Sequence, residues 1–136
     1  MGAHVMVVTA DLGLAELVMP QLANLGVVAV RARDVEDARQ QLGPVEVLVV
    51  DSLLEGGPEL AWETRTEGER HVVVIAPAEE APSWRTGEGL DVLAEPFSIV
   101  ELVAVLRAAL AARAARLDNV IDLRERTAPE PWWASN

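Results

Sequence analysis

The sequence predicts an α/β fold in which a parallel sheet of five strands carries helices on both faces. Segments with helical spacing or helix-capping residues alternate with short apolar runs, and such alternation favours a parallel sheet. The runs are rich in valine, which is typical of strands buried on both faces. They are Val5–Val8, Val27–Val30, Val45–Val50, Val72–Ala76 and Val92–Ala94.

The first two predicted helices have clear end signals. Asp11 is a candidate N-cap of a helix that stops at Gly26. Pro20 falls inside that helix, so we expect a kink there or a helix in two pieces. Asp34 is placed to cap a second helix over Val35–Leu42.

The signals of the remaining helices differ in strength. Pro58 suits the first turn of a third helix. Pro77–Gly89 carries proline, serine and glycine and gives the weakest helix signal. Ser98 and Glu101 form a capping box that opens a strong last helix. One face of that helix is apolar and comprises Ile99, Leu102, Val103, Leu106 and Leu110.

Five strand–helix units in this length predict a flavodoxin-like, doubly wound (βα)5 sandwich of three layers, with strand order 2-1-3-4-5. In such sheets the ligand crevice lies at the carboxyl ends of the first and third strands. The first strand ends at Thr9, Ala10 and Asp11, and the third ends at Asp51. The predicted fold therefore brings the Asp51 carboxylate to the expected site.

The bulk composition limits the function classes. The 136 residues carry a net charge of −11 and no cysteine or lysine, and the pI is near 4.5. Such a surface repels nucleic acid and anionic lipid, so we expect no direct binding to either. Neither a membrane-length apolar run nor a signal peptide is recognisable, and we expect a cytoplasmic protein. The two histidines, His4 and His71, are too few for a zinc motif, and His71 is interpreted as a partly exposed structural residue.

Three segments together resemble a known family. They are V-L-V-V-D at Val47–Asp51, V-V-V-I-A at Val72–Ala76, and V-L-A-E-P-F at Val92–Phe97 followed by a long helix. In this order and at these separations, the chain resembles a response-regulator receiver (CheY-like) domain over roughly His4–Arg116. The resemblance implies a phospho-acceptor at Asp51 and a cis peptide bond before Pro96.

Four other positions of the family's phosphorylation site depart from its pattern. Thr9 and Ala10 stand where the family has two acids that hold Mg²⁺, and Asp11 comes one residue late. Ala76 replaces a threonine or serine, and Glu95 replaces a lysine. The resemblance is therefore to a degenerate receiver, a pseudoreceiver.

We expect these departures to weaken Mg²⁺ binding and phosphoryl transfer to Asp51. Mg²⁺ needs hard oxygen ligands, and phosphoryl transfer depends on charge neutralisation. Two carboxylates ~4 Å apart repel by roughly 4 kcal/mol at an effective dielectric constant of ~20. Glu95 is open to three interpretations: it shares a proton with Asp51, holds a cation with Asp51, or is solvated, and we favour the last. Asp11 and Asp51 are weak metal candidates, and Asp11 is better interpreted as a helix cap.

The leading hypothesis is a non-enzymatic signalling module that contacts proteins without phosphorylation and needs no cofactor. The alternative is a working phospho-receiver of a phosphorelay, with Mg²⁺ and phosphorylation at Asp51. A flavin or nucleotide binder is a third class, disfavoured because Thr9–Leu14 holds only one glycine. The expected contact face comprises Trp84, Glu95, Phe97, Ile99, Leu102, Leu106 and Leu110.

The C-terminal end is predicted to differ from the rest. We expect a receiver-like domain over residues 1–116 and an extension over residues 117–136. Leu117–Leu123 can prolong the last helix, whereas Asp118-Asn119 can break it. Trp132 and Trp133 follow in a proline-flanked tail, which docks on this chain or a dimer mate, or binds another partner. A homodimer through the last helix and tail is expected, and the signalling partner is not identified by the sequence.

Overall fold

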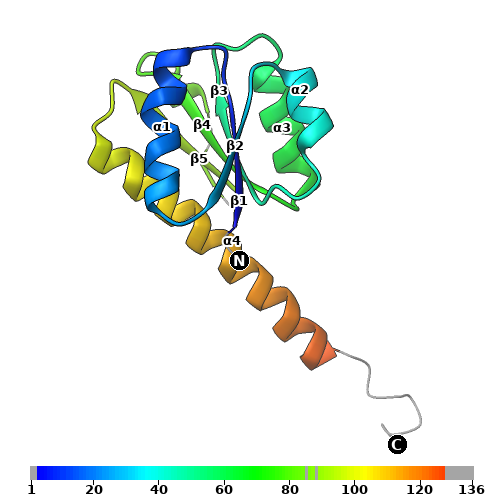
Figure 1. Cartoon of the computed structure of the whole chain (residues 1–136). Helices are drawn as coiled ribbons and strands as arrows, with labels where there is room; N and C mark the ends of the chain where they lie inside the picture. Colours follow the sequence, from blue (N-terminus) through cyan, green and yellow to red (C-terminus); the bar gives the residue numbers. More distant parts are fainter. Residues whose placement is uncertain (1–2, 85, 88, 128–136) are drawn as a thin grey trace, which may run out of the picture.

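A computed structural model of the chain describes residues 3–84, 86–87 and 89–127 (Figure 1). Its core is one parallel sheet with the order β2-β1-β3-β4-β5, which confirms the predicted topology. The strands are β1 (His4–Val8), β2 (Val28–Ala32), β3 (Val47–Asp51), β4 (His71–Pro77) and β5 (Leu90–Glu95). The valine-rich runs form strands because helices cover both faces of the sheet.

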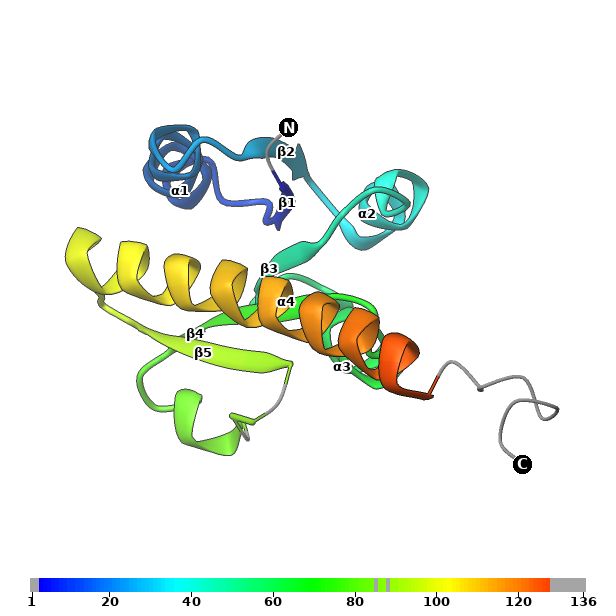
Figure 2. The ribbon, with the colours of Figure 1, turned by 90° about the horizontal axis from the view of Figure 1, so that it is seen from below.

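Helices form the two outer layers around the sheet (Figures 1 and 2). The helices α1 (Leu12–Asn24) and α4 (Ile99–Thr127) cover one face, and α2 (Val35–Gln41) and α3 (Gly57–Glu67) cover the other. Successive strand residues alternate between the faces. Met6 thus belongs to the core under α2 and α3, and Val7 belongs to the core under α1 and α4.

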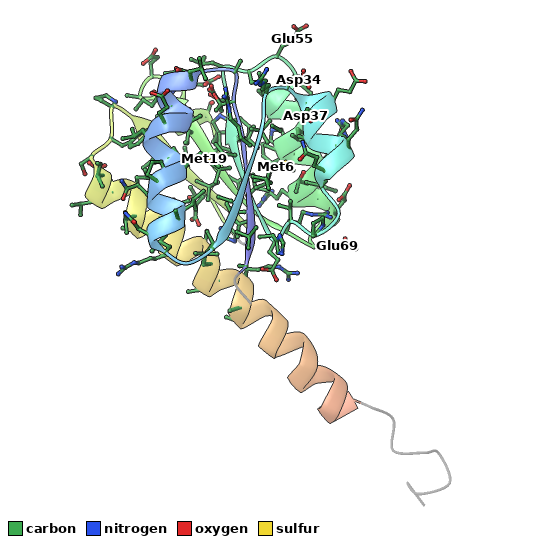
Figure 3. All side chains as sticks on the ribbon, in the orientation of Figure 1. Met6, Met19, Asp34, Asp37, Glu55 and Glu69 are labelled. Carbon is green, nitrogen blue, oxygen red and sulfur yellow. The ribbon has the colours of Figure 1, made fainter. Side chains whose placement is uncertain are left out.

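The acidic side chains lie mainly outside these cores. Figure 3 shows Met6 within the body, whereas Asp34, Asp37, Glu55 and Glu69 lie at the periphery on the α2 and α3 side. At the start of α2, the Asp34 carboxylate accepts a hydrogen bond from the Asp37 amide at 2.8 Å, which confirms Asp34 as the N-cap.

Helix α1 is one continuous helix, so the alternative of two pieces is wrong. Its N-cap is Asp11, and Gly26 follows its last turn with a φ of 74°. That left-handed conformation suits glycine and ends the helix. Pro20 lies on the exposed side, while Val18 and Leu22 bury their side chains against the sheet. Burial on both sides of Pro20 holds the helix together despite the missing backbone donor.

The fourth crossover contains no α-helix, contrary to the predicted five repeats. Between β4 and β5 the described residues form only a short 3₁₀ turn over Ala81–Ser83. Trp84, 8% exposed, belongs to the core on that face of the sheet. Its ring stacks on Trp62 of α3 with the centroids 5.5 Å apart. A large aromatic side chain thus covers apolar surface that a helix would otherwise bury.

Helix α4 continues past the predicted domain boundary. It runs through Asp118-Asn119 to Thr127, so the alternative in which these residues break the helix is wrong. Its 29 residues span about 43 Å at ~1.5 Å per residue, and Figure 1 shows its second half projecting away from the sheet. Trp132 and Trp133 lie outside the described residues. None of the described helices is long and apolar enough to cross a membrane.

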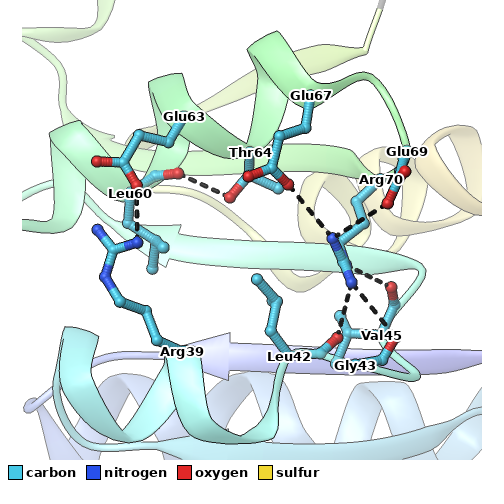
Figure 4. A network of polar contacts seen from close by, with 10 residues as sticks. All are labelled: Arg39, Leu42, Gly43, Val45, Leu60, Glu63, Thr64, Glu67, Glu69 and Arg70. Carbon is cyan, nitrogen blue, oxygen red and sulfur yellow. Dashed lines mark hydrogen bonds and ion pairs between the residues drawn. The ribbon is translucent and has the colours of Figure 1, made fainter.

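Polar contacts join the elements at the amino ends of the strands. Arg70 donates hydrogen bonds to the carbonyl oxygens of Val45 and Leu42, and Arg39 of α2 pairs with Glu63 of α3 at 2.7 Å (Figure 4). These contacts tie α2 and the loop after it to α3 and β4.

His71 is buried, so the prediction of a partly exposed residue is wrong. It begins β4, which lies between β3 and β5, and neighbouring elements cover it to 3% exposure. Its Nε2 lies 2.8 Å from the Asp91 carboxylate on β5. This contact joins two adjacent strands, and a structural role for His71 follows from it.

Candidate functional site

Asp51 and Thr9 meet at the carboxyl edge of the sheet. Both are buried, with exposures of 8% and 0%. The Thr9 hydroxyl donates a hydrogen bond to Asp51 Oδ2 at 2.8 Å, and the Leu53 amide donates to Oδ1 at 3.0 Å. Both carboxylate oxygens therefore have a donor from the protein itself.

The loop after β1 explains the orientation of Asp11. The Asp11 amide donates to the Thr9 hydroxyl oxygen at 3.0 Å, and the Asp11 carboxylate accepts from the Leu14 amide at 3.2 Å. Asp11 is thus engaged as a helix cap, which was the favoured interpretation. The described residues contain no group of three or more histidine, aspartate or glutamate side chains suited to hold a metal ion.

Helix α3 begins directly against Asp51. A Cβ added to Gly57 would lie 2.6 Å from the Asp51 carbonyl oxygen, a separation that real Cβ atoms essentially never show. Glycine therefore permits the close approach of the helix to the end of β3. The backbone that carries Asp51 is fixed on this side by packing.

Glu95 lies near Asp51 and Asp11 and is partly exposed, so it is a solvent-accessible carboxylate with acidic neighbours. Burial raises the pKa of Glu95 above its usual value, and the negative charges of Asp51 and Asp11 raise it further. The peptide bond from Glu95 to Pro96 is cis, as the resemblance implied. A cavity of about 300 Å³ adjoins Glu95 and is lined by Asp11, Gly13, Leu14, Leu17, Glu95, Pro96 and Phe97.

A Glu95→Gln variant is expected to be more stable than the wild type at pH 7, by about 0.5 kcal/mol. The folded state retains the Glu95 proton to higher pH than the unfolded chain does. The stability that this proton contributes is complete below the unfolded pKa, near 4.5, and is lost as the pH rises through the folded pKa. Thermal unfolding between pH 4 and about pH 7 should therefore show the gain shrinking toward pH 4.

Glu63→Gln is the control for this pH dependence, because the hydrogen bond from Arg39 lowers the pKa of Glu63. Its effect should have the opposite sign: stability is lost relative to the wild type at neutral pH, and the loss disappears in acid. Equal pH profiles for wild type and Glu95→Gln would contradict the placement of Glu95 among the acids.

Ala76 and Ser52 occupy the remaining side of the site. Ala76 is fully buried and brings no hydroxyl group. The Ser52 hydroxyl donates to Glu80 Oε2 at 2.6 Å and so joins the end of β3 to the loop after β4. Sequence reasoning missed this contact. The only available signal was a serine directly after Asp51, and it gives no hint of a partner 28 residues away.

Comparison with solved structures supports the fold. NtrX from Brucella abortus in complex with ADP matches with 25% identity and a TM-score of 0.76, over 96% of this chain and 31% of that one. A putative response regulator from Chloroflexus aurantiacus J-10-fl matches with 25% identity and a TM-score of 0.70, over 82% of this chain and 99% of that one. The fold is that of a response-regulator receiver domain.

A further receiver domain matches this chain, and the coverage of the matched proteins differs. The BeF3-activated DrrB receiver domain matches with 21% identity and a TM-score of 0.68, over 82% of this chain and 99% of that one. The chain spans about a third of the NtrX protein that it matches. No family model and no curated protein matches the sequence.

The contact face expected for this receiver fold needs correction. Leu102 and Leu106 are buried in the core, as is Trp84, so these residues cannot contact a partner on the surface. Phe97 and Leu110 are partly buried and pack against the core. Ile99, 48% exposed, remains available. Val100, 78% exposed, was missed; with Ile99 it borders a cavity of about 420 Å³ whose other lining residues are Val103, Ala104 and Arg107.

Proposed function

We propose that the chain is a receiver-like module of signal transduction that contacts other proteins without phosphorylation of Asp51. One observation carries this proposal: the Thr9 hydroxyl occupies one oxygen of the Asp51 carboxylate, and the Leu53 amide occupies the other. In this state Asp51 is a satisfied structural group at the end of β3. The proposed module is not an enzyme and needs no cofactor.

The charges around Asp51 favour the same proposal. Phosphoryl transfer requires positive charge at the developing phosphoryl oxygens. Glu95 instead adds a third carboxylate to the neighbourhood of Asp51 and Asp11. Phosphorylation of Asp51 would replace its single negative charge by roughly two, a net gain of about one negative charge in this acidic region. Exposed Ile99 and Val100 at the start of α4 provide the proposed protein-contact surface.

A two-dimensional NMR titration with Mg²⁺, and then with beryllofluoride as a mimic of the aspartyl phosphate, tests this proposal. We expect no saturable shifts at Thr9, Asp51 or α4 at millimolar Mg²⁺ and mimic. Shifts that cluster on these residues and vanish in Asp51→Ala would overturn the proposal. They would assign the chain as a phospho-receiver of a phosphorelay.

A further inference from the structure

A second pocket opens at the carboxyl edge of the sheet, on the other side of Thr9. It has a volume of about 340 Å³ and lies between the loop that leads into α1 and the end of β2. Two arginines and two apolar side chains line it: Arg31, Arg33, Ala10 and Leu12. The chain has a net charge of −11, yet two guanidinium groups line this one pocket. The Asp37 carboxylate lies beside it and accepts a hydrogen bond from the Arg33 amide at 3.3 Å.

The two guanidinium groups keep their capacity to bind an anion. Arg31 Nη2 donates to the Thr9 carbonyl oxygen at 3.1 Å, and Arg31 Nε is buried without a hydrogen-bond partner among the described residues. Neither Arg31 nor Arg33 is in an ion pair within the part of the chain that the structure describes. Arg33 is exposed, and no hydrogen bond among the described residues engages its guanidinium, so this group is accessible to an anion in the pocket.

We propose that this pocket binds a small organic acid through its carboxylate. The planar guanidinium group matches the geometry of both carboxylate and phosphate, so the charge of the ligand decides which of the two binds better. The Asp11 carboxylate follows Ala10 in the chain, and the whole protein is acidic, which disfavours a doubly charged phosphate. Leu12 is 64% exposed and offers apolar contact to a short hydrocarbon group.

The pocket is linked to Asp51 by hydrogen bonds through one residue. Arg31 binds the Thr9 carbonyl oxygen, and the Thr9 hydroxyl binds Asp51 Oδ2. An anion that moves Arg31 therefore also disturbs Thr9, the residue whose hydroxyl binds Asp51. The other oxygen of the Asp51 carboxylate accepts a hydrogen bond from the Leu53 amide. Binding of an anion in the pocket should therefore change the chemical shift of the Leu53 amide. The inference does not rest on the proposed function, because the pocket can bind an acid whether or not Asp51 accepts a phosphoryl group.

The test is an NMR titration with isovalerate, acetate, inorganic phosphate and chloride at matched ionic strength. It follows the amide signals of Ala10 and Arg33 and the Nε–H signals of the arginines. We expect saturation by isovalerate in the millimolar range, weaker binding of acetate and phosphate, and no saturable effect of chloride. Arg33→Gln should weaken isovalerate binding about tenfold. The matched control is Arg39→Gln, which removes an arginine of the α2–α3 ion pair and should leave the affinity unchanged.

Thr9→Val tests the link to Asp51 separately. It removes the hydroxyl but keeps the backbone carbonyl that Arg31 binds. Isovalerate should still bind this variant, and the Leu53 amide shift should be lost.

No saturation by any probe, equal effects of chloride, or unchanged affinity in Arg33→Gln would overturn the site. Tighter binding of phosphate would overturn its assignment to an organic acid, and a retained Leu53 shift in Thr9→Val would overturn the link. The Mg²⁺ and beryllofluoride titration reports on Asp51 independently of all these outcomes.

Discussion

Replacement of Trp84 by alanine is expected to lower the free energy of unfolding by about 3–5 kcal/mol. Trp84 is 8% exposed and fills the core on the face where the fourth α-helix is missing. Few other atoms can replace the lost indole, because the short turn over Ala81–Ser83 cannot collapse as a helix would. Urea unfolding followed by circular dichroism measures the change.

Trp62→Ala is the matched control for Trp84→Ala. Trp62 is the other ring of the stacked pair, but it is 40% exposed, so its loss should cost markedly less than that of Trp84. Equal losses for the two variants would contradict the role of Trp84 as the residue that covers the sheet. A Trp84→Phe variant should recover part of the stability, since it restores an aromatic ring at the same place.

The triple variant Thr9→Asp, Ala10→Asp and Glu95→Lys is expected to bind Mg²⁺ at least about tenfold more tightly than the wild type. Thr9 already points its side chain at Asp51 Oδ2, so a carboxylate at position 9 places two acids at one site. Glu95→Lys removes a carboxylate near Asp51 and adds a cation. Thr9→Asp and Ala10→Asp each add one negative charge, and Glu95→Lys raises the charge by two. The net charge of the triple variant therefore stays at −11. Any gain is therefore local. Isothermal titration calorimetry with Mg²⁺ measures it.

Asp51→Ala in the triple background controls for adventitious binding. It should return the Mg²⁺ affinity to the wild-type level, because it removes the carboxylate that the added acids share with the metal. Beryllofluoride should bind the triple variant and not this control. If the triple variant gains no Mg²⁺ affinity, then the residues at positions 9, 10 and 95 do not set the Mg²⁺ affinity of this site.

Several features could be predicted because their signals are local in the sequence. A continuous apolar run such as Val47–Val50 is typical of a strand that helices cover on both faces. Its residues alone therefore indicate that it lies in the central sheet. Asp11 and Asp34 cap helices whose first residues follow them directly. The position of Asp51 at the carboxyl edge followed from the order of strands and helices.

Other features depend on contacts between distant segments and could not be predicted. The Thr9 hydroxyl reaches Asp51 across 42 residues, and the Ser52 hydroxyl reaches Glu80 across 28. The apolar spacing in α4 identified a buried stripe, but only the packed helix showed that Leu102 and Leu106 form it while Val100 faces outward. Periodicity gives the faces of a helix, and the neighbouring layer decides which face is buried.

The sequence by itself determined the layer order and the strand order, and it placed Thr9, Ala10, Ala76 and Glu95 around the expected position of Asp51. Only the tertiary structure decided what those residues do. Thr9 became the donor that satisfies Asp51, Glu95 entered an acidic neighbourhood, and Arg31 came to hold the Thr9 carbonyl. The physical reason is that secondary structure follows from short-range pattern, whereas hydrogen-bond partners and electrostatic neighbours follow from which distant segments the sheet brings together.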